Sequence, residues 1–181
     1  MTASATTRTA LDPSRLRRAL GRVPTSVAVV TGVVEGEPVG MTVGSLTSVS
    51  SDPPIIGFFA AAQSYTFAQL RQASDLCVSV LSEAQGDVCY GFASRTGAKF
   101  DCGEWDTESG PAPRLVSASA WIECTPSMIF DAGDHVGMLA AVTDVEYTDH
   151  RPLVFYRGKL ARLHPSVTHH PATSRLDWWS L

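Results

Sequence analysis

Hydrophobic and polar positions along the chain predict short strands interrupted by three short helices. The first helix is marked by Asp12 as N-cap and Pro13 at the first helical position, and it ends near Gly21. Leu16 and Leu20 lie one turn apart with arginines around them, which indicates an amphipathic helix. The arginines either bind a ligand or form a solvated face, and the solvated face is the preferred interpretation.

Two further helices are predicted. Residues 64–73 have Ser64 as a plausible N-cap and place Phe67 toward the core. The first turn of such a helix is also a natural anion site, because its N–H groups are unpaired. Ser82 and Gln85 fit a capping box for a helix that runs to about residue 93. Residues 97–113 are predicted to form a long loop, of a length that is often functional.

The predicted strands are rich in β-branched and aromatic residues and bounded by turn residues. They span residues 26–34, 39–46, 55–61, 76–81, 118–128, 135–147, 153–156 and 160–163. Residues 55–61 are apolar enough to be buried on both faces. Turns at 35–38 and 131–134 predict hairpins. Hairpins without regular βαβ alternation favour a mainly antiparallel β barrel with helical excursions.

Length and charge narrow the class of protein. The 181 residues suit one domain, at 11–164, after a disordered start at 1–10 and before a tail at 165–181. Trp178 and Trp179 in that tail suggest docking on a partner chain or over a pocket. A net charge of −4 gives no reason to expect nucleic acid or an anionic membrane. Without a long apolar run or a signal-peptide core, the chain is expected to be cytoplasmic.

Metal and disulfide chemistry is not predicted. The four cysteines lack the two-residue spacing of a zinc or thioredoxin site, so reduced thiols, some of them buried, are expected. The pair His169–His170 is a weak metal candidate and is interpreted as part of a solvated tail.

A stretch from Gly40 to Pro54 is the main candidate for ligand binding. It carries six hydroxyl side chains and only one charged residue, Asp52. Such a segment can offer backbone N–H groups and hydroxyls to a ligand without bulky side chains. The alternative is a polar edge strand that runs into a loop.

The usual catalytic motifs are missing: there is no nucleophile elbow, Walker loop or Rossmann glycine fingerprint. An enzyme of this sequence would therefore depend on a cofactor, and a flavin fits. Its ring needs hydrogen-bond partners along one edge, its phosphate needs hydroxyls, N–H groups or an arginine, and hydride transfer to it needs orientation rather than a protein acid or base.

The chain resembles the flavin reductase family of split-barrel FMN-binding proteins, which includes the small reductase partners of two-component flavin monooxygenases. The resemblance covers roughly residues 16–163. It rests on an ordered set of segments: LRRALGRVPTSVAVVT, GMTVGSLTSVSSDPP, Ser64-x-Thr66, LCVSVLSEAQ, Lys99-Phe100, AWIECTP, AGDH and PLVFYRG. It implies a mainly β split barrel with short helices, FMN or FAD and NADH or NADPH as cofactors, a homodimer and an oxygenase partner.

The resemblance also implies a flavin site. Residues 42–45 and 48–50 would line the isoalloxazine and ribityl chain, and Ser64 and Thr66 would bind the phosphate. The cofactor-binding residues so implied are Gly40, Met41, Thr42, Val43, Gly44, Ser45, Ser48, Val49, Ser50, Ser64, Thr66, Lys99, Phe100, Tyr156 and Arg157.

The remaining implied roles concern the outer part of the site. Lys99 and Phe100 would lie near the flavin's outer portion. His135 would face the nicotinamide as the catalytic residue, and Tyr156 and Arg157 would complete that region. Structural alternatives stay open: Tyr156 as core, Arg157 as a partner for an aspartate at 134, and His135 as a brace of its hairpin.

The sequence departs from the family pattern at two places. Gly44-Ser45-Leu46 stands where many relatives have Asn-Ser-Phe, and alanines at 140–141 replace a usual glycine. The resemblance leaves two alternative functions. The first is an NAD(P)H:flavin oxidoreductase that releases reduced flavin to an oxygenase. The second is a flavoprotein of the same fold that retains its flavin for electron transfer or acts on another substrate.

Overall fold

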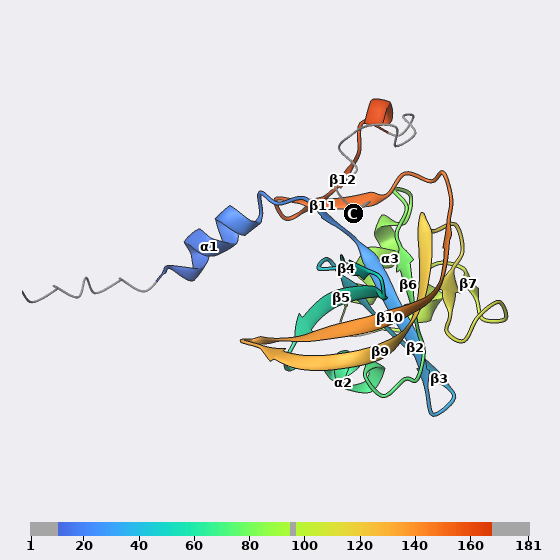
Figure 1. Ribbon diagram of the computed structural model, residues 1–181. Helices are drawn as coiled ribbons and strands as arrows, with labels where there is room; N and C mark the ends of the chain where they lie inside the picture. The colour runs from blue at the N-terminus through green and yellow to red at the C-terminus, as the bar shows by residue number, and fades with distance from the viewer. Residues whose placement is uncertain (1–10, 95–96, 168–181) are drawn as a thin grey trace, which may run out of the picture.

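The computed structural model describes residues 11–94 and 97–167 (Figure 1). The helices are α1 (Pro13–Leu20), α2 (Tyr65–Leu70) and α3 (Gly86–Ala93), with 3-10 turns η1 (Lys99–Asp101) and η2 (Pro165–Val167). The strands are β1 (Thr25–Ser26), β2 (Ala28–Val34), β3 (Glu37–Val43), β4 (Thr47–Ser51), β5 (Pro54–Ala61), β6 (Leu76–Val80), β7 (Trp105–Asp106), β8 (Arg114–Leu115), β9 (Ala120–Ala132), β10 (His135–Tyr147), β11 (Leu153–Tyr156) and β12 (Lys159–Arg162).

The main sheet has seven strands in the order β3-β2-β6-β9-β10-β5-β4, and every pairing in it is antiparallel. The described residues also form a three-stranded sheet, β1-β11-β12, a two-stranded sheet, β7-β8, and an isolated bridge between Ser82 and Pro152. The end strands β3 and β4 of the main sheet do not pair with each other. The prediction of a mainly β, antiparallel chain with few helices is confirmed.

The two predicted hairpins form. Strands β2 and β3 join through Glu35 and Gly36, both with positive φ. In the β9–β10 hairpin, β9 continues to Ala132, which pairs with His135, so the turn is shorter than the predicted 131–134. Gly133 carries the positive φ of +72° that this tight turn needs. The hairpin is long, and its turn therefore projects from the body (Figure 1).

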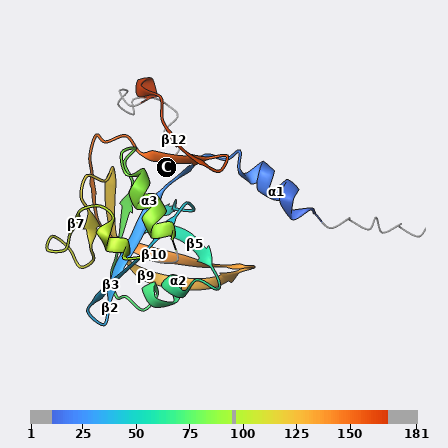
Figure 2. The same cartoon turned by 180° about the vertical axis from the view of Figure 1, so that it is seen from behind.

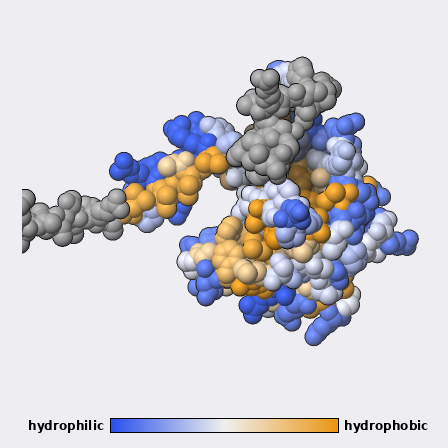
Figure 3. Space-filling view, viewed as in Figure 1, coloured by the Kyte–Doolittle hydropathy of each residue, from blue (hydrophilic) through white to orange (hydrophobic). Residues whose placement is uncertain are grey.

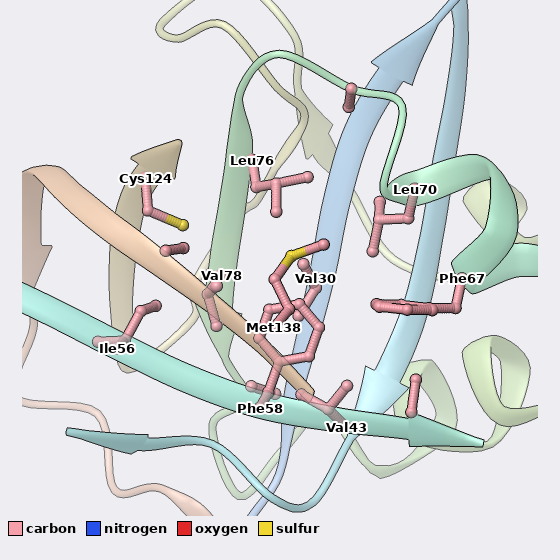
Figure 4. Packing of buried hydrophobic residues seen from close by; sticks show 14 residues of the cluster. Val30, Val43, Ile56, Phe58, Phe67, Leu70, Leu76, Val78, Cys124 and Met138 are labelled. Atoms are coloured by element: carbon pink, nitrogen blue, oxygen red, sulfur yellow. The ribbon is translucent and has the colours of Figure 1, made fainter. Parts of the chain in front are cut away.

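A core of β-branched, aromatic and sulfur-containing residues lies between the main sheet and α2. Phe58 and Met138, on neighbouring strands, are fully buried and point into it (Figure 4). The ring of Phe67 meets that of Phe58 edge-on at 6.3 Å, and Leu70 is also fully buried. These two side chains anchor α2, which by itself is too short to be a stable helix.

A second cluster fixes α3 and the loop that follows it. Phe92 on α3 lies 5.1 Å from the rings of both Phe100 and Trp105. The predicted long loop is therefore held down by aromatic packing. It also contains η1 and the small β7–β8 sheet.

The predicted starts of α1 and α2 are confirmed, whereas the predicted end of α2 and the predicted start of α3 are wrong. The Asp12 side chain accepts from the Ser14 N–H at 2.9 Å and caps α1, and the Ser64 hydroxyl accepts from the Phe67 N–H at 3.2 Å and caps α2. Helix α2 ends at residue 70, not 73. The Ser82 N–H donates to Gln85 at 2.9 Å, which is half of the predicted capping box, but α3 begins only at residue 86.

The hydroxyl-rich stretch differs from the prediction. Strand β3 ends at Val43, and residues 47–51 form a separate edge strand, β4, that pairs with β5. The Ser45 hydroxyl ties the bend between β3 and β4 to β5, because it accepts from the Phe59 N–H at 2.9 Å and donates to the Phe59 carbonyl at 3.1 Å. Phe59 itself is 39% exposed. The prediction that residues 55–61 are buried on both faces is therefore wrong, since β5 lies near the end of the sheet with one face uncovered.

Several sequence predictions concern residues outside the described ranges. These are the disordered start at 1–10, the histidine pair at 169–170 and the docking of Trp178 and Trp179. All four cysteines are described, and each is a free thiol, with Cys77, Cys89 and Cys124 buried. Within the described residues, no helix is long and apolar enough to cross a membrane.

Candidate active site

A pocket of 990 Å³ lies between the start of α2, the end of α3 and the turn of the β9–β10 hairpin. Helices α2 and α3 are on the same side of the molecule, as the turned view shows (Figure 2), and both pack against β3. The lining residues are Met41, Thr42, Ala61, Ala62, Gln63, Ser64, Tyr65, Thr66, Phe92, Ala93, Ser94, Lys99, Gly133 and Asp134.

Two hydroxyls lie at the α2 wall. Ser64 is the N-cap of α2, and its oxygen accepts from the Phe67 N–H, so its own hydrogen remains a donor. Thr66 lies two residues further on and also lines the pocket. The wall thus offers two hydroxyl donors to an acidic or phosphate group.

Lys99 is the cationic residue among the described residues that line the pocket. Its Nζ donates to the carbonyls of Gly40 and Phe92, each at 3.2 Å, which fixes the side chain between β3 and the end of α3. An ammonium has three N–H donors, so one remains for a ligand. Burial lowers the pKa of Lys99 below the usual value, because the charged form loses hydration there.

The hairpin turn supplies Asp134 to the lining, whereas the predicted catalytic residue His135, the first residue of β10, lies next to it outside the lining. Nδ1 of His135 lies 2.6 Å from a carboxylate oxygen of Asp134. This hydrogen bond holds the pKa of Asp134 below its usual range. Since a carboxylate only accepts, Nδ1 is the donor. The Ala62 N–H donates to the Asp134 carbonyl at 3.0 Å and ties the turn to the end of β5.

Part of the predicted site is brought together. Met41, Thr42, Ser64, Thr66 and Lys99 all line the pocket, although they come from three separate segments. The Thr42 hydroxyl is committed to the carbonyl of residue 89 at 3.1 Å.

Other predicted residues do not line the pocket but contact residues that do, or lie in the core. Gly40 contributes its carbonyl to Lys99, and Phe100 packs on the ring of Phe92. Val43 is buried in the core.

The β4 positions and their neighbours lie apart from the pocket lining. Gly44 and Ser45 lie in the bend after β3, and Ser48, Val49 and Ser50 lie on edge strand β4, where the register with β5 shifts between Ser48 and Ser50.

Tyr156 and Arg157 are also outside the lining. Tyr156 is the last residue of β11 in the separate three-stranded sheet, and Arg157 follows it in the turn to β12, where its N–H donates to the Gly21 carbonyl at 2.9 Å. Arg157 has a φ of +51°, in the left-handed region. The Asp134 carboxylate is hydrogen-bonded to His135, and among the salt bridges of the described residues none joins it to Arg157, so the alternative that paired Arg157 with Asp134 does not occur.

Three groups of lining residues were not predicted from the sequence. The first is the end of β5 with Gln63 and Tyr65, which flank the Ser64-x-Thr66 segment and could have been included with it. The second is the turn at Gly133 and Asp134, which belongs to the AGDH segment and could have been included with His135. The third is the end of α3 at residues 92–94, which no sequence signal indicated, because its place beside α2 depends on packing between distant segments.

Comparison with known proteins places the chain in a family. The model of the flavin reductase like domain matches residues 20–164. The chain is 34% identical over 160 residues to the flavin-dependent monooxygenase reductase subunit HsaB of Rhodococcus jostii, covering 88% of this chain and 82% of that protein. It is 36% identical over 153 residues to a flavin reductase of Pseudomonas putida, covering 83% and 90%.

Solved structures agree with the sequence comparison. The NADH:FAD oxidoreductase SgcE6 of Streptomyces globisporus C-1027, in complex with NAD and FAD fragments, superposes with a TM-score of 0.80 at 31% identity, over 87% of this chain and 98% of that one. A longer putative oxidoreductase of Sinorhizobium meliloti 1021 gives a TM-score of 0.80 at 34% identity, and the chain spans 55% of its length. The chain belongs to the flavin reductase like domain family.

Proposed function

We propose that the chain is an NAD(P)H:flavin oxidoreductase, which reduces FMN or FAD by hydride transfer and supplies the reduced flavin to a partner monooxygenase. The observation that carries this proposal is that the family match over residues 20–164 contains every residue of the 990 Å³ pocket. Relatives named as reductase subunits of monooxygenases support the same activity.

The residues of the pocket fit a flavin nucleotide. Pockets of roughly 300–1,000 Å³ accept ligands of this size, and this one measures 990 Å³. Its lining combines apolar surface at Met41 and Phe92 with hydroxyls and one ammonium. A flavin bound there would supply the electron-pair acceptor for a hydride, chemistry that no side chain provides.

We assign phosphate binding to the α2 wall. Ser64 and Thr66 donate from their hydroxyls, and Lys99 adds a charge at a position fixed by two carbonyls. Charge-assisted hydrogen bonds of this type are about twice as strong as neutral ones.

We assign the nicotinamide side to the β9–β10 turn. Asp134, which lines the pocket, is hydrogen-bonded to the imidazole of His135, the next residue, and fixes the orientation of that ring. A ring fixed in this way can orient a second planar ligand without transferring a proton itself. For Gly44, Ser45, residues 48–50 and the pair at 156–157, the assignment to the site rests on the resemblance alone.

The proposal includes an assembly and a location. The main sheet, whose end strands β3 and β4 are unpaired with each other, is proposed to be a split barrel. Open edges and exposed apolar residues on β5 and β9 favour a homodimer. Residues 11–164 are taken as one cytoplasmic domain.

A pocket-filling variant tests the function. Ala93 is exposed at the end of α3 and lines the pocket, so the indole of Ala93→Trp should occupy space that the flavin needs. Ala84 is also exposed but lines a different, 320 Å³ cavity, so Ala84→Trp is the matched control. NADH oxidation with free FMN or FAD should be lost in Ala93→Trp and kept in Ala84→Trp. Equal activity in both variants would place flavin reduction elsewhere.

A further inference from the structure

Charge is divided unevenly between two parts of the chain. Residues 11–26 and 153–163, which contain α1 and the β11–β12 hairpin, carry seven basic side chains and one acidic one. Residues 27–152 carry sixteen acidic and five basic side chains. We refer to the first part as the basic arm and to the second as the body.

The basic arm exposes apolar side chains that nothing in the described chain covers. Helix α1 has no buried residue and extends away from the body (Figure 1). Leu16 and Leu20, one turn apart, are 44% and 60% exposed, and Phe155 on the adjoining hairpin is 43% exposed. Isolated helices shorter than about 12–15 residues are marginal in water. An eight-residue helix with an uncovered leucine stripe therefore needs a surface to pack on.

The arm is anchored at its base. The Arg157 N–H donates to the Gly21 carbonyl, which joins the end of α1 to the β11–β12 turn. The space-filling view shows an open gap between α1 and the body, with hydrophobic surface on both sides of it (Figure 3). The hydrogen bond at Gly21 fixes the C-terminal end of α1, and the rest of the helix extends away from the body (Figure 1).

The body carries a complementary surface. Val49 on β4, Phe59 on β5 and Met128 and Phe130 on β9 are all more than one-third exposed. Phe59 and Phe130 meet edge-on at 5.9 Å on the outward side of the main sheet. We call these four residues the outer apolar face. Exposed carboxylates lie on the same part of the sheet, at positions 131 and 144 on β9 and β10 and at 52 and 134 in the turns β4–β5 and β9–β10.

We propose that the basic arm of one copy docks on the outer apolar face of a second copy, so that the two chains of the homodimer exchange their arms. The leucine stripe of α1 covers the apolar side chains, and the arginines of the arm meet the carboxylates around them. In a two-fold arrangement both contacts form twice, which covers both exposed surfaces of each chain.

Charge favours a second copy over a lipid surface as the occupant. A basic amphipathic helix can lie on an anionic membrane. However, the acidic body beside the arm would be repelled by the same membrane. A second copy supplies opposite charge and apolar surface together, at the residues that the monomer leaves uncovered.

The test uses flavin-free protein and measures its mass by light scattering at micromolar concentration. Leu16→Asp/Leu20→Asp disables the arm, and Met128→Asp disables the face; all three side chains are exposed in the monomer, so folding should persist, as circular dichroism can verify. Tyr90→Asp is the control, because Tyr90 is an exposed residue of α3 that belongs to neither the arm nor the face. We expect dimers for the wild type and the control, and dimer affinity weakened by about tenfold or more in the two disabled variants.

Mixing separates arm exchange from other interfaces. An equimolar mixture of the arm and face variants keeps one intact arm and one intact face, so it should form more dimer than either variant alone. A monomeric wild type, an arm variant with unchanged dimer affinity, or a mixture without recovery would each overturn the proposal. So would a monomer that sediments with phosphatidylserine vesicles through its arm. Flavin turnover of the wild type is measured separately, so a failed dimer and a failed reductase are distinguishable.

Discussion

The Gly40 carbonyl accepts a hydrogen bond from Nζ of Lys99 at 3.2 Å, although the two residues are 59 positions apart. The same Nζ binds the Phe92 carbonyl, and the ring of Phe92 lies against Gly40 so closely that a Cβ there would be 2.7 Å from the ring carbon Cε1. Gly40, Phe92 and Lys99 thus form one unit that joins β3 to the end of α3 behind the pocket.

Gly40→Ala should therefore destabilise the protein. The added methyl group would meet the Phe92 ring, and neighbouring atoms of Thr31 and Val30 at 3.2 Å limit relaxation. Overpacking of this kind costs about 1–3 kcal/mol. Denaturant unfolding measures the loss. Gly44→Ala is the control, because its Cβ would make only ordinary contacts, the nearest at 3.5 Å. Equal stability of the two variants would show that the Phe92 ring moves freely.

Lys99→Met should weaken FMN much more than riboflavin, since only FMN carries a phosphate. In the wild type, FMN affinity should also fall with rising pH in a window below the usual lysine pKa of about 10.4, because burial lowers the Lys99 pKa and the charge is lost earlier. Fluorescence titration with both ligands across pH measures this. Lys159→Met, which removes the chain's other lysine, should retain the pH window. A window that persists in Lys99→Met would assign it to another group.

Ser64→Ala/Thr66→Ala should likewise affect FMN more than riboflavin. Each lost hydrogen bond to a charged group is worth about 1.5–3 kcal/mol. Ser64 also caps α2, so Thr66→Val alone separates binding from helix stability. Thr47→Val on edge strand β4 is the control for loss of a hydroxyl outside the pocket. Equal loss of affinity for both ligands would place the phosphate elsewhere.

His135→Ala should leave flavin affinity nearly unchanged and lower kcat/KM for NAD(P)H. Misplacement of a reactant by 1 Å can cost about 100-fold. If His135 only braces the turn through Asp134, the variant should instead lose thermal stability and flavin affinity. Anaerobic single-turnover reduction, with flavin occupancy measured separately, distinguishes these outcomes. An unchanged rate per occupied site would leave His135 a structural role only.

Local chemistry made much of this architecture predictable. Strand β10 at 135–147 could be predicted because its residues are of the types that favour strands and a turn precedes them. The capping role of Ser64 could be predicted because its side chain accepts a hydrogen bond within its own helix. The same local signals indicated an anion site at the start of α2, and the family resemblance added Thr66 and Lys99.

The features that could not be predicted from the sequence depend on packing between segments that are far apart in the chain. The exposure of Phe59 depends on the position of β5 near the end of the sheet, which its sequence does not encode. The approach of residues 92–94 to α2 depends on both helices packing against β3. The separation of Tyr156 from the pocket depends on β11 joining β1 and β12 rather than the main sheet.

The most direct test of the central claim is anaerobic mixing of the purified protein with NADH, with NADPH in a parallel run, and an excess of free FMN or FAD. If the chain is a flavin reductase that releases its product, flavin absorbance should bleach through many turnovers per protein, and Ala93→Trp should abolish this. Bleaching that stops at one flavin per protein would indicate a flavoprotein that retains its cofactor. No bleaching with either nucleotide would contradict the assignment of reductase activity to this chain.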